Sequence, residues 1–141
     1  MTFIPILIVL LVLLAGYLFW QAARHRAATG LPGGRVIYAD PKTWGRVEAP
    51  LYDARLGLTG KPDYLVRHGE DIIPVEVKTG RTPSGPRDGH IYQLAAYCLL
   101  VERTFGKRPP YGILRYRDRT FTIDYTQQLE QELEDLLDAI R

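Results

Sequence analysis

An apolar segment at the start of the chain is the first feature of its hydrophobic pattern. Residues 3–20 are almost all Ile, Leu, Val or aromatic residues, and residues 1–23 contain no Asp, Glu, Lys or Arg. At about 1.5 Å of rise per residue, a helix of this length just crosses a hydrocarbon core of about 30 Å. The pattern therefore predicts one transmembrane helix, with residues 3–23 in contact with the membrane.

Arg24 and Arg26 directly follow the apolar segment, whereas no Lys or Arg precedes it. By the positive-inside rule, this asymmetry places the following residues in the cytoplasm. A cleaved signal peptide is the alternative, although its apolar part usually spans about 7–15 residues and follows basic residues. We therefore predict a single-pass membrane protein with a cytoplasmic domain: an anchor at residues 1–26, a linker containing Gly and Pro at 27–34, and the domain at 35–141.

Alternating polar and apolar positions in residues 60–78 predict a β-hairpin. Two β-type runs flank a polar turn centred between Gly69 and Glu70. The same centre results if Asp63 pairs directly with Glu76. The turn chemistry and this pairing therefore predict one and the same register.

The side chains of this hairpin divide into two faces, because side chains alternate along a strand. Asp63, Glu76 and Lys78 share one face. The opposite face is apolar and carries Tyr64, Val66, Ile73, Val75 and Val77. Two carboxylates at cross-strand distance, about 5 Å between their Cβ atoms, repel each other unless a cation lies between them.

Mg²⁺ or Mn²⁺ suits such a pair, because both ions prefer oxygen ligands. Lys78 beside the cation could then orient or deprotonate an attacking water. The alternative is a solvated strand that carries a cross-strand ion pair.

Further strands and two amphipathic helices are predicted along the chain. Residues 51–58 read as a strand that enters the hairpin, and runs at 111–116 and 120–125 read as a second hairpin. Residues 90–105 and 127–140 have the three-and-four spacing of helices. A glycine at position 106 is a natural end for the first of these helices.

Two pairs of residues near the carboxylates are candidates for nucleic-acid binding. Gln93 and Tyr97 lie four residues apart on one helix face and could hold a nucleotide by a phosphate hydrogen bond and base stacking. A Tyr near an apolar stripe is as readily a core residue. Residues 79–89 form a Gly- and Pro-rich loop in which Arg81 and Arg87 could close over phosphates, although surface loops also carry arginines for solubility.

Charge is unevenly distributed along the chain. The net charge is only +2, yet residues 78–119 hold nine Lys or Arg against three acids, and residues 120–141 hold six acids against one Arg. A basic middle suits a nucleic acid, and a solvated surface of mixed sign would have the same composition. The single cysteine, Cys98, excludes intramolecular disulfides and any all-cysteine zinc or iron–sulfur site within this chain.

Three motifs follow in order on the predicted hairpin and helix. They are G-x-x-D at residues 60–63, E-x-K at residues 76–78 and Q-x-x-x-Y at residues 93–97. Together they resemble the PD-(D/E)xK nuclease superfamily. The segments LGLTGKPDYLV and HIYQLAAYCLLVE are similar to its RecB-like branch, close to the CRISPR-associated exonucleases and the nuclease domains of helicase-nucleases. The resemblance covers about residues 51–116.

This resemblance implies a restriction-endonuclease-like α/β fold, in which helices flank a central mixed β-sheet, here preceded by a transmembrane helix. It also implies cleavage of DNA phosphodiester bonds with Mg²⁺ or Mn²⁺. Position by position, Asp63 and Glu76 would be metal ligands, with the main-chain carbonyl of Val77 as a further ligand. Lys78 would position the attacking water.

Gln93 and Tyr97 match the branch motif that contacts DNA and shapes the site, and Arg81 or Arg87 would hold the strand. The CRISPR-associated members carry an iron–sulfur cluster on four cysteines, so no such cluster is expected here. We predict a membrane-anchored, exonuclease-like DNA nuclease that acts on single strands or duplex ends, with a protein partner or homo-oligomer left open. The alternatives are a DNA-binding or membrane-tethering module that keeps the fold without cutting, and a structural membrane protein with an accidental motif match.

Overall fold

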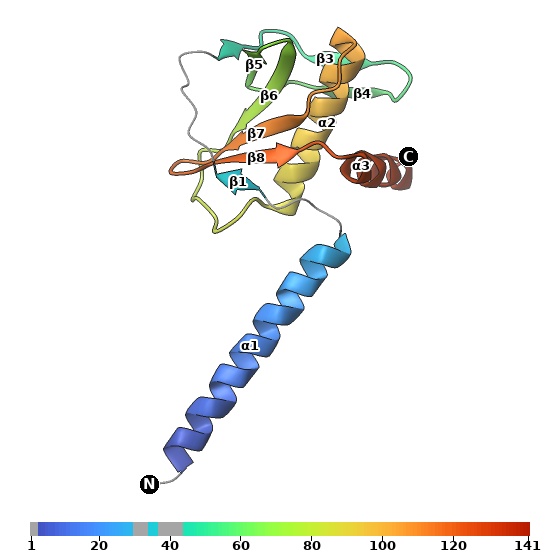
Figure 1. The fold of residues 1–141 in the computed structure, drawn as a ribbon. Helices are drawn as coiled ribbons and strands as arrows, with labels where there is room; N and C mark the ends of the chain where they lie inside the picture. The colour runs from blue at the N-terminus through green and yellow to red at the C-terminus, as the bar shows by residue number, and fades with distance from the viewer. Residues whose placement is uncertain (1–2, 30–33, 37–43) are drawn as a thin grey trace. The chain divides into compact units, whose positions relative to one another are not determined.

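The structure is a computed structural model that describes residues 3–29, 34–36 and 44–141. The chain divides into two compact units, residues 1–31 and 32–141. The first unit contains helix α1 (Phe3–Thr29), and the second contains every other helix and strand that the structure describes (Figure 1).

Helix α1 includes the apolar segment, but the prediction that this segment spans a membrane is wrong. A membrane span needs about 20 consecutive, predominantly apolar residues. Within the residues that the structure describes, no helix is both long enough and apolar enough to cross a membrane. This finding contradicts the predicted transmembrane helix and the membrane contact through residues 3–23. The predicted single-pass membrane localisation is wrong for the same reason.

The second unit is built on a six-stranded sheet with the order β1-β8-β7-β6-β5-β2. Its strands are β1 (Arg35–Val36), β2 (Gly45–Arg46), β5 (Tyr64–His68), β6 (Asp71–Val77), β7 (Tyr111–Arg115) and β8 (Thr120–Asp124). Strands β6 and β7 pair in parallel and the other neighbours pair antiparallel. The chain therefore has an α/β fold with a mixed sheet, which is consistent with the restriction-endonuclease-like fold that the resemblance implied.

The hairpin of β5 and β6 has the predicted register. His68 pairs with Asp71 beside the turn, and the same ladder, continued away from the turn, brings Asp63 opposite Glu76. Gly69 has a φ of +62°, the positive value that a type II′ turn requires at its first central position. Turn chemistry therefore sets the alignment of the two carboxylates.

The apolar face of this hairpin is covered, as the alternation of side chains predicted. Ile73, Val75 and Ile113 form a buried cluster, and Trp44 and Tyr64 pack against it. The rings of Trp44 and Tyr64 contact each other with centroids 5.5 Å apart. The polar face lies against helix α2 (Asp88–Phe105), where Gln93 bonds to Glu76.

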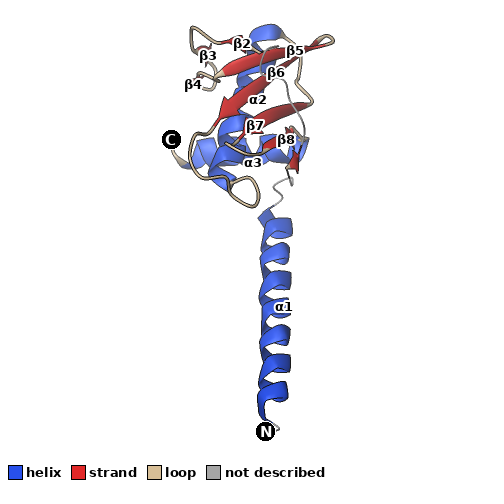
Figure 2. Ribbon diagram, turned by 90° about the vertical axis from the view of Figure 1, so that its left-hand side faces the viewer, coloured by secondary structure: helices blue, strands red, loops and turns tan. Residues whose placement is uncertain are grey.

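Helix α2 (Asp88–Phe105) packs on β6 and β7 and connects them in sequence (Figure 2). It begins two residues before the predicted start. It ends at Gly106 as predicted, with a φ of +76° and an N–H that donates to the Glu102 carbonyl at 2.9 Å. At Gly112 of β7, an added Cβ would lie 2.6 Å from Cγ of Leu94, which is fully buried. Only glycine fits at this crossing of helix and strand.

The prediction of a single strand over residues 51–58 is wrong. This segment folds back on itself as β3 (Leu51–Asp53) and β4 (Leu58–Gly60), which form a separate two-stranded sheet beside α2. The side chain of Asp53 accepts a hydrogen bond from a main-chain N–H three residues later, and Gly57 has a φ of +59°. These two residues form a turn that the apolar pattern does not reveal.

Helix α3 (Gln127–Ala139) packs against α2. The Thr126 side chain accepts a hydrogen bond from a main-chain N–H of its first turn at 3.1 Å, the usual N-cap arrangement. Arg108 forms ion pairs with Glu102 and Glu130 and lies over the ring of Tyr125. This cluster joins the end of α2 to the start of α3.

Replacement of Gly112 by alanine tests the close packing of α2 on the sheet. Gly112→Ala is expected to lower the free energy of unfolding by about 1–3 kcal/mol, because the added methyl group overpacks the contact with Leu94. Urea unfolding measures the change. The matched control is Gly89→Ala in α2, where an added Cβ meets no atom within 4 Å. This control should equal or exceed the wild type by up to about 1 kcal/mol, and equal loss in both variants would contradict the packing.

Candidate active site

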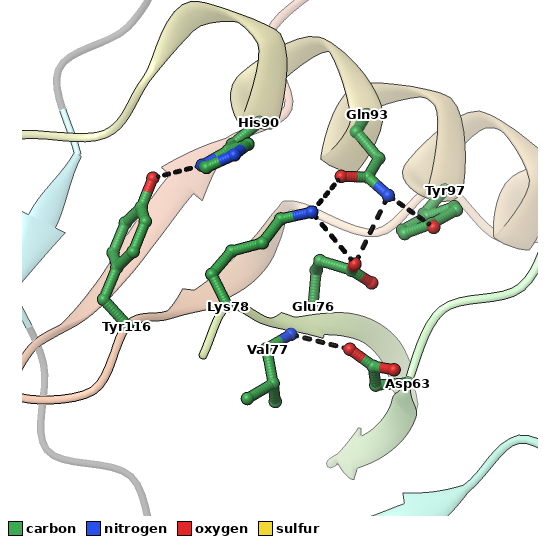
Figure 3. A network of polar contacts seen from close by, with 8 residues as sticks. All are labelled: Asp63, Glu76, Val77, Lys78, His90, Gln93, Tyr97 and Tyr116. Atoms are coloured by element: carbon green, nitrogen blue, oxygen red, sulfur yellow. Dashed lines mark hydrogen bonds and ion pairs between the residues drawn. The ribbon is translucent and has the colours of Figure 1, made fainter. Parts of the chain in front are cut away.

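Asp63 and Glu76 lie at adjoining ends of β5 and β6. Oδ2 of Asp63 accepts a hydrogen bond from the main-chain N–H of Val77 at 2.8 Å, which ties the residue before β5 to the last residue of β6 (Figure 3). The Asp63 side chain is exposed, whereas Glu76 is only 8% exposed. One carboxylate of the pair is therefore open to solvent and the other is enclosed beneath α2.

The two oxygens of Glu76 have different surroundings. Oε1 accepts hydrogen bonds from Nζ of Lys78 and Nε2 of Gln93, each at 3.3 Å. Oε2 is buried and has no hydrogen-bond partner among the described residues. A buried carboxylate oxygen without a partner costs free energy, so this oxygen is a strong potential ligand for a cation.

The pKa of Glu76 also indicates that this carboxyl group suits a cation. Burial raises the pKa of Glu76 above its ordinary value, and the neighbouring Asp63 carboxylate raises it further. The ion pair with Lys78 opposes these effects without cancelling them. Ionisation of Glu76 is therefore less favourable here than in water. A bound cation would offset this effect, because it stabilises the ionised carboxylate.

Helix α2 supplies an amide and a phenol to the same cluster. Oε1 of Gln93 accepts a hydrogen bond from Nζ of Lys78 at 2.7 Å, and Nε2 donates to the Tyr97 hydroxyl at 2.9 Å (Figure 3). Because Nε2 also donates to Glu76, the amide of Gln93 is engaged at both ends. Burial is the main reason that the pKa of Tyr97 is raised, and the ring is only 8% exposed. Gln93 therefore contacts both Lys78 and Glu76, and Tyr97 in turn contacts Gln93.

Gly60, the first residue of the G-x-x-D motif, lies against the ring of Tyr97. An added Cβ at Gly60 would lie 2.8 Å from Cε1 of Tyr97 and 3.0 Å from Cδ1 of Leu100. Glycine at this position therefore allows β4 to approach α2 closely. The motif thus combines a packing requirement at Gly60 with a carboxylate at Asp63.

The predicted basic residues lie beside this cluster. Residues 79–87 lie in the loop between β6 and α2, and both Arg81 and Arg87 belong to it. Together with Lys78, these arginines line a cavity of about 260 Å³. The complete lining is Lys78, Thr79, Gly80, Arg81, Arg87, His90 and Tyr116.

Two residues of this cavity were missed from the sequence. Nδ1 of His90 lies 2.7 Å from the Tyr116 hydroxyl, which also accepts the main-chain N–H of Arg87 at 3.2 Å. The position of His90, three residues before Gln93, is a signal that could have placed it on the same helix face. Tyr116 follows β7, and only the parallel pairing of β6 with β7 brings it here.

The residues present fit a hard divalent cation. Asp63 and Glu76 offer carboxylate oxygens, and Oε2 of Glu76 lacks a partner among the described residues. No group of three or more His, Cys, Asp or Glu side chains placed to hold a metal occurs in the part of the chain that the structure describes. Mg²⁺ is usually bound through one or two carboxylates and keeps several waters, so two carboxylates suffice for it.

The raised pKa of Glu76 predicts a pH-dependent stability difference. A carboxyl whose pKa is higher in the folded state destabilises the fold when it is ionised, and has no effect below the ordinary value of 4.5, where it is protonated in both states. In EDTA, Glu76→Gln should therefore match the wild type below pH 4.5. As the pH rises through the raised pKa, the variant should become the more stable protein in thermal unfolding.

The control for this measurement is Glu48→Gln, at an exposed position. It should follow the wild type at every pH. Adding Mg²⁺ or Mn²⁺ at about 100 times its dissociation constant should stabilise the wild type by about 2.7 kcal/mol and Glu76→Gln by much less. A Glu76→Gln variant that is less stable than the wild type at pH 7 in EDTA would contradict the electrostatic account.

Comparison with known proteins identifies the family of this chain. A model of the PD-(D/E)XK nuclease superfamily matches residues 13–141. Similar curated proteins are the "CRISPR-associated exonuclease Cas4" and the "CRISPR-associated exonuclease Cas4/endonuclease Cas1 fusion" of Rhodospirillum rubrum, each 32% identical over 122 residues that make up 83% of this chain. These residues cover 36% of the first relative and 21% of the second, so the chain spans about a third or less of their lengths. Because the family model matches nearly the whole chain, this protein belongs to the PD-(D/E)XK nuclease superfamily.

Proposed function

We propose that the second unit of this chain is a nuclease that hydrolyses phosphodiester bonds of DNA with Mg²⁺ or Mn²⁺. One observation carries this proposal: a buried glutamate with one unpartnered oxygen lies beside a second carboxylate and a lysine. A protein that only binds DNA gains nothing from this costly arrangement. A metal-dependent hydrolase can use all three groups, the carboxylates as metal ligands and the lysine beside the attacking water.

In the proposed site, Asp63 and Glu76 would hold the cation, together with the main-chain carbonyl of Val77. When bound, the cation would polarise the phosphate and lower the pKa of a water molecule. The hydrogen bond from the Val77 N–H keeps one oxygen of Asp63 occupied, which fixes the direction of the carboxylate. Burial of Glu76 excludes water from the inner side of the site.

Lys78 is proposed to act on the attacking water or on the phosphate oxygen. An ammonium group has three N–H donors. One of them reaches Gln93 at 2.7 Å and another reaches Glu76 at 3.3 Å. The third remains for the water or the phosphate, and the side chain is 24% exposed, so a ligand has access to it.

The predicted nucleic-acid contacts divide into two groups. Arg81 and Arg87 line the cavity beside Lys78 and are proposed to bind phosphates of the strand. Gln93 and Tyr97 bond to one another, and Gln93 bonds to Lys78 and Glu76, which favours a role in positioning. A direct contact of Gln93 or Tyr97 with DNA stays a prediction.

A second candidate function is a DNA-binding module that keeps the fold without cutting. The observation in its favour is that the described residues supply only two carboxylates at the site and no cluster of three metal-binding side chains. Such a module would bind DNA through the same basic residues. Cleavage distinguishes the two functions.

The full chain is the protein for this test. End-labelled single-stranded DNA, duplex DNA and RNA of the same sequence are incubated with Mg²⁺, Mn²⁺ or EDTA. Wild type should cut DNA only with a cation, and Lys78→Ala should cut it at least about a hundredfold more slowly, because the group that assists water attack is lost.

Lys107→Ala is the matched control, because Lys107 pairs with Asp71 at the distant turn of the hairpin. It should cut at the wild-type rate. Retention of DNA without cleavage by any protein would establish the binding module, and cleavage of RNA alone would overturn the assignment to DNA.

A further inference from the structure

The cavity beside Lys78 concentrates positive charge. Its lining includes Lys78, Arg81 and Arg87, and none of the described residues that line it is acidic. The chain as a whole has a net charge of only +2, so the charge in this cavity is not a general property of the surface. An anion is the ligand that such a lining attracts.

The loop that forms one wall of the cavity is held in place by hydrogen bonds. Asp118, in the turn between β7 and β8, donates its main-chain N–H to Oγ1 of Thr82 at 3.1 Å, and the Thr82 hydroxyl lies 3.4 Å from the Asp118 carboxylate. At the other end of the loop, the N–H of Arg87 donates to the Tyr116 hydroxyl. The cavity is therefore held between the loop and the chain that follows β7.

Tyr116 connects His90 to the loop. Its hydroxyl accepts the Arg87 N–H at 3.2 Å and lies 2.7 Å from Nδ1 of His90, to which its own proton is available for donation. Burial lowers the pKa of His90, and Lys78 and Arg87 lower it further. A neutral imidazole that accepts this proton at Nδ1 carries its own proton on Nε2, which gives the cavity lining an N–H donor.

We propose that this cavity binds a phosphate group of the nucleic-acid strand next to the bond that is cut. His90 and Arg87 bind its oxygens, and Tyr116 is the positioning residue that orients His90. The proposal rests on the proposed nuclease function for the identity of the strand. Lys78 belongs both to the carboxylate site and to the cavity lining. When the phosphodiester bond to be cut lies beside Lys78, the next phosphate of the strand is therefore expected near the cavity.

The phosphate has two sources with the same chemistry. It is either a terminal phosphomonoester at a strand end or a phosphodiester within the strand. The first source would make the cavity a sensor of phosphorylated ends. The second would make it a grip on the strand backbone.

Binding measured in EDTA tests the cavity independently of cleavage. Short single-stranded DNA with a 5′-phosphate, a 3′-phosphate or hydroxyls at both ends is titrated against the full chain by fluorescence anisotropy. His90→Ala should weaken binding of at least one of these strands about tenfold, the effect of losing one hydrogen bond to a charged group. His90→Gln keeps an N–H donor and should recover part of the affinity.

Tyr116→Phe tests the positioning role and keeps the ring, which is only 2% exposed and packs against Phe121. As a single substitution, Tyr116→Phe should weaken binding a few-fold. Combined with His90→Ala, it should cause no further loss, because Tyr116 acts through His90. The matched control is His68→Ala, at an exposed position of β5. Thermal unfolding in parallel shows that each variant is folded.

Each outcome decides the proposal. A preference for one phosphorylated end that disappears in His90→Ala supports the terminal phosphate, and equal weakening for all three strands supports the internal phosphodiester. Equal affinity of His90→Ala and His68→Ala for every strand would contradict phosphate binding in the cavity. If the wild type still cleaves DNA, the proposed nuclease function is unaffected by that result. Binding that depends on His90 in a wild type that never cleaves DNA supports the cavity and overturns the nuclease.

Discussion

One constraint organises the site: the burial of one ionisable carboxyl group, that of Glu76, beside a second carboxylate. Neither burial nor the Asp63 charge favours the ionised form, and both raise the pKa of Glu76. Among the described residues, the Lys78 ammonium and the Gln93 amide donate hydrogen bonds to this carboxyl group, and both contact the same oxygen. The other oxygen stays without a described partner, so the fold carries an electrostatic cost at the position where its chemistry is proposed to occur.

Close packing of α2 on the sheet makes this burial possible. Two glycines, Gly60 and Gly112, stand where β4 and β7 pass nearest to the helix, and at each an added Cβ would come within 3 Å of a buried side chain. The helix therefore holds Gln93 and Tyr97 directly over Glu76. The glycines thus allow the helix to approach the sheet, and the polar residues of the helix then contact the Glu76 carboxylate.

The local parts of this arrangement could be predicted from the sequence, and the long-range parts could not. The turn at Gly69 and the alternation of side chains are local properties, and together they gave the correct register for Asp63 and Glu76. The cavity residue Tyr116 depends on the parallel pairing of β6 with β7, which no local pattern encodes.

Two other predictions are wrong because they rest on apolar composition alone. In residues 51–58, the side-chain hydrogen bond of Asp53 and the positive φ of Gly57 override a strand-like pattern. In residues 3–20, the apolar run predicts a membrane span, but no described helix meets the requirements of one. Hydrophobicity alone therefore predicts neither the path of residues 51–58 nor the surroundings of residues 3–20.

The two-residue turn at Gly69 has a consequence for how this chain tolerates changes in length. Because side chains alternate with a period of two, inserting or deleting one residue within β5 or β6 would move Asp63 or Glu76 to the apolar face of the sheet. The hairpin arms are therefore constrained in residue number as well as in residue type. The loop at 79–87 lies outside this ladder, so insertions there would change the reach of the arginines without disturbing the pairing of the carboxylates.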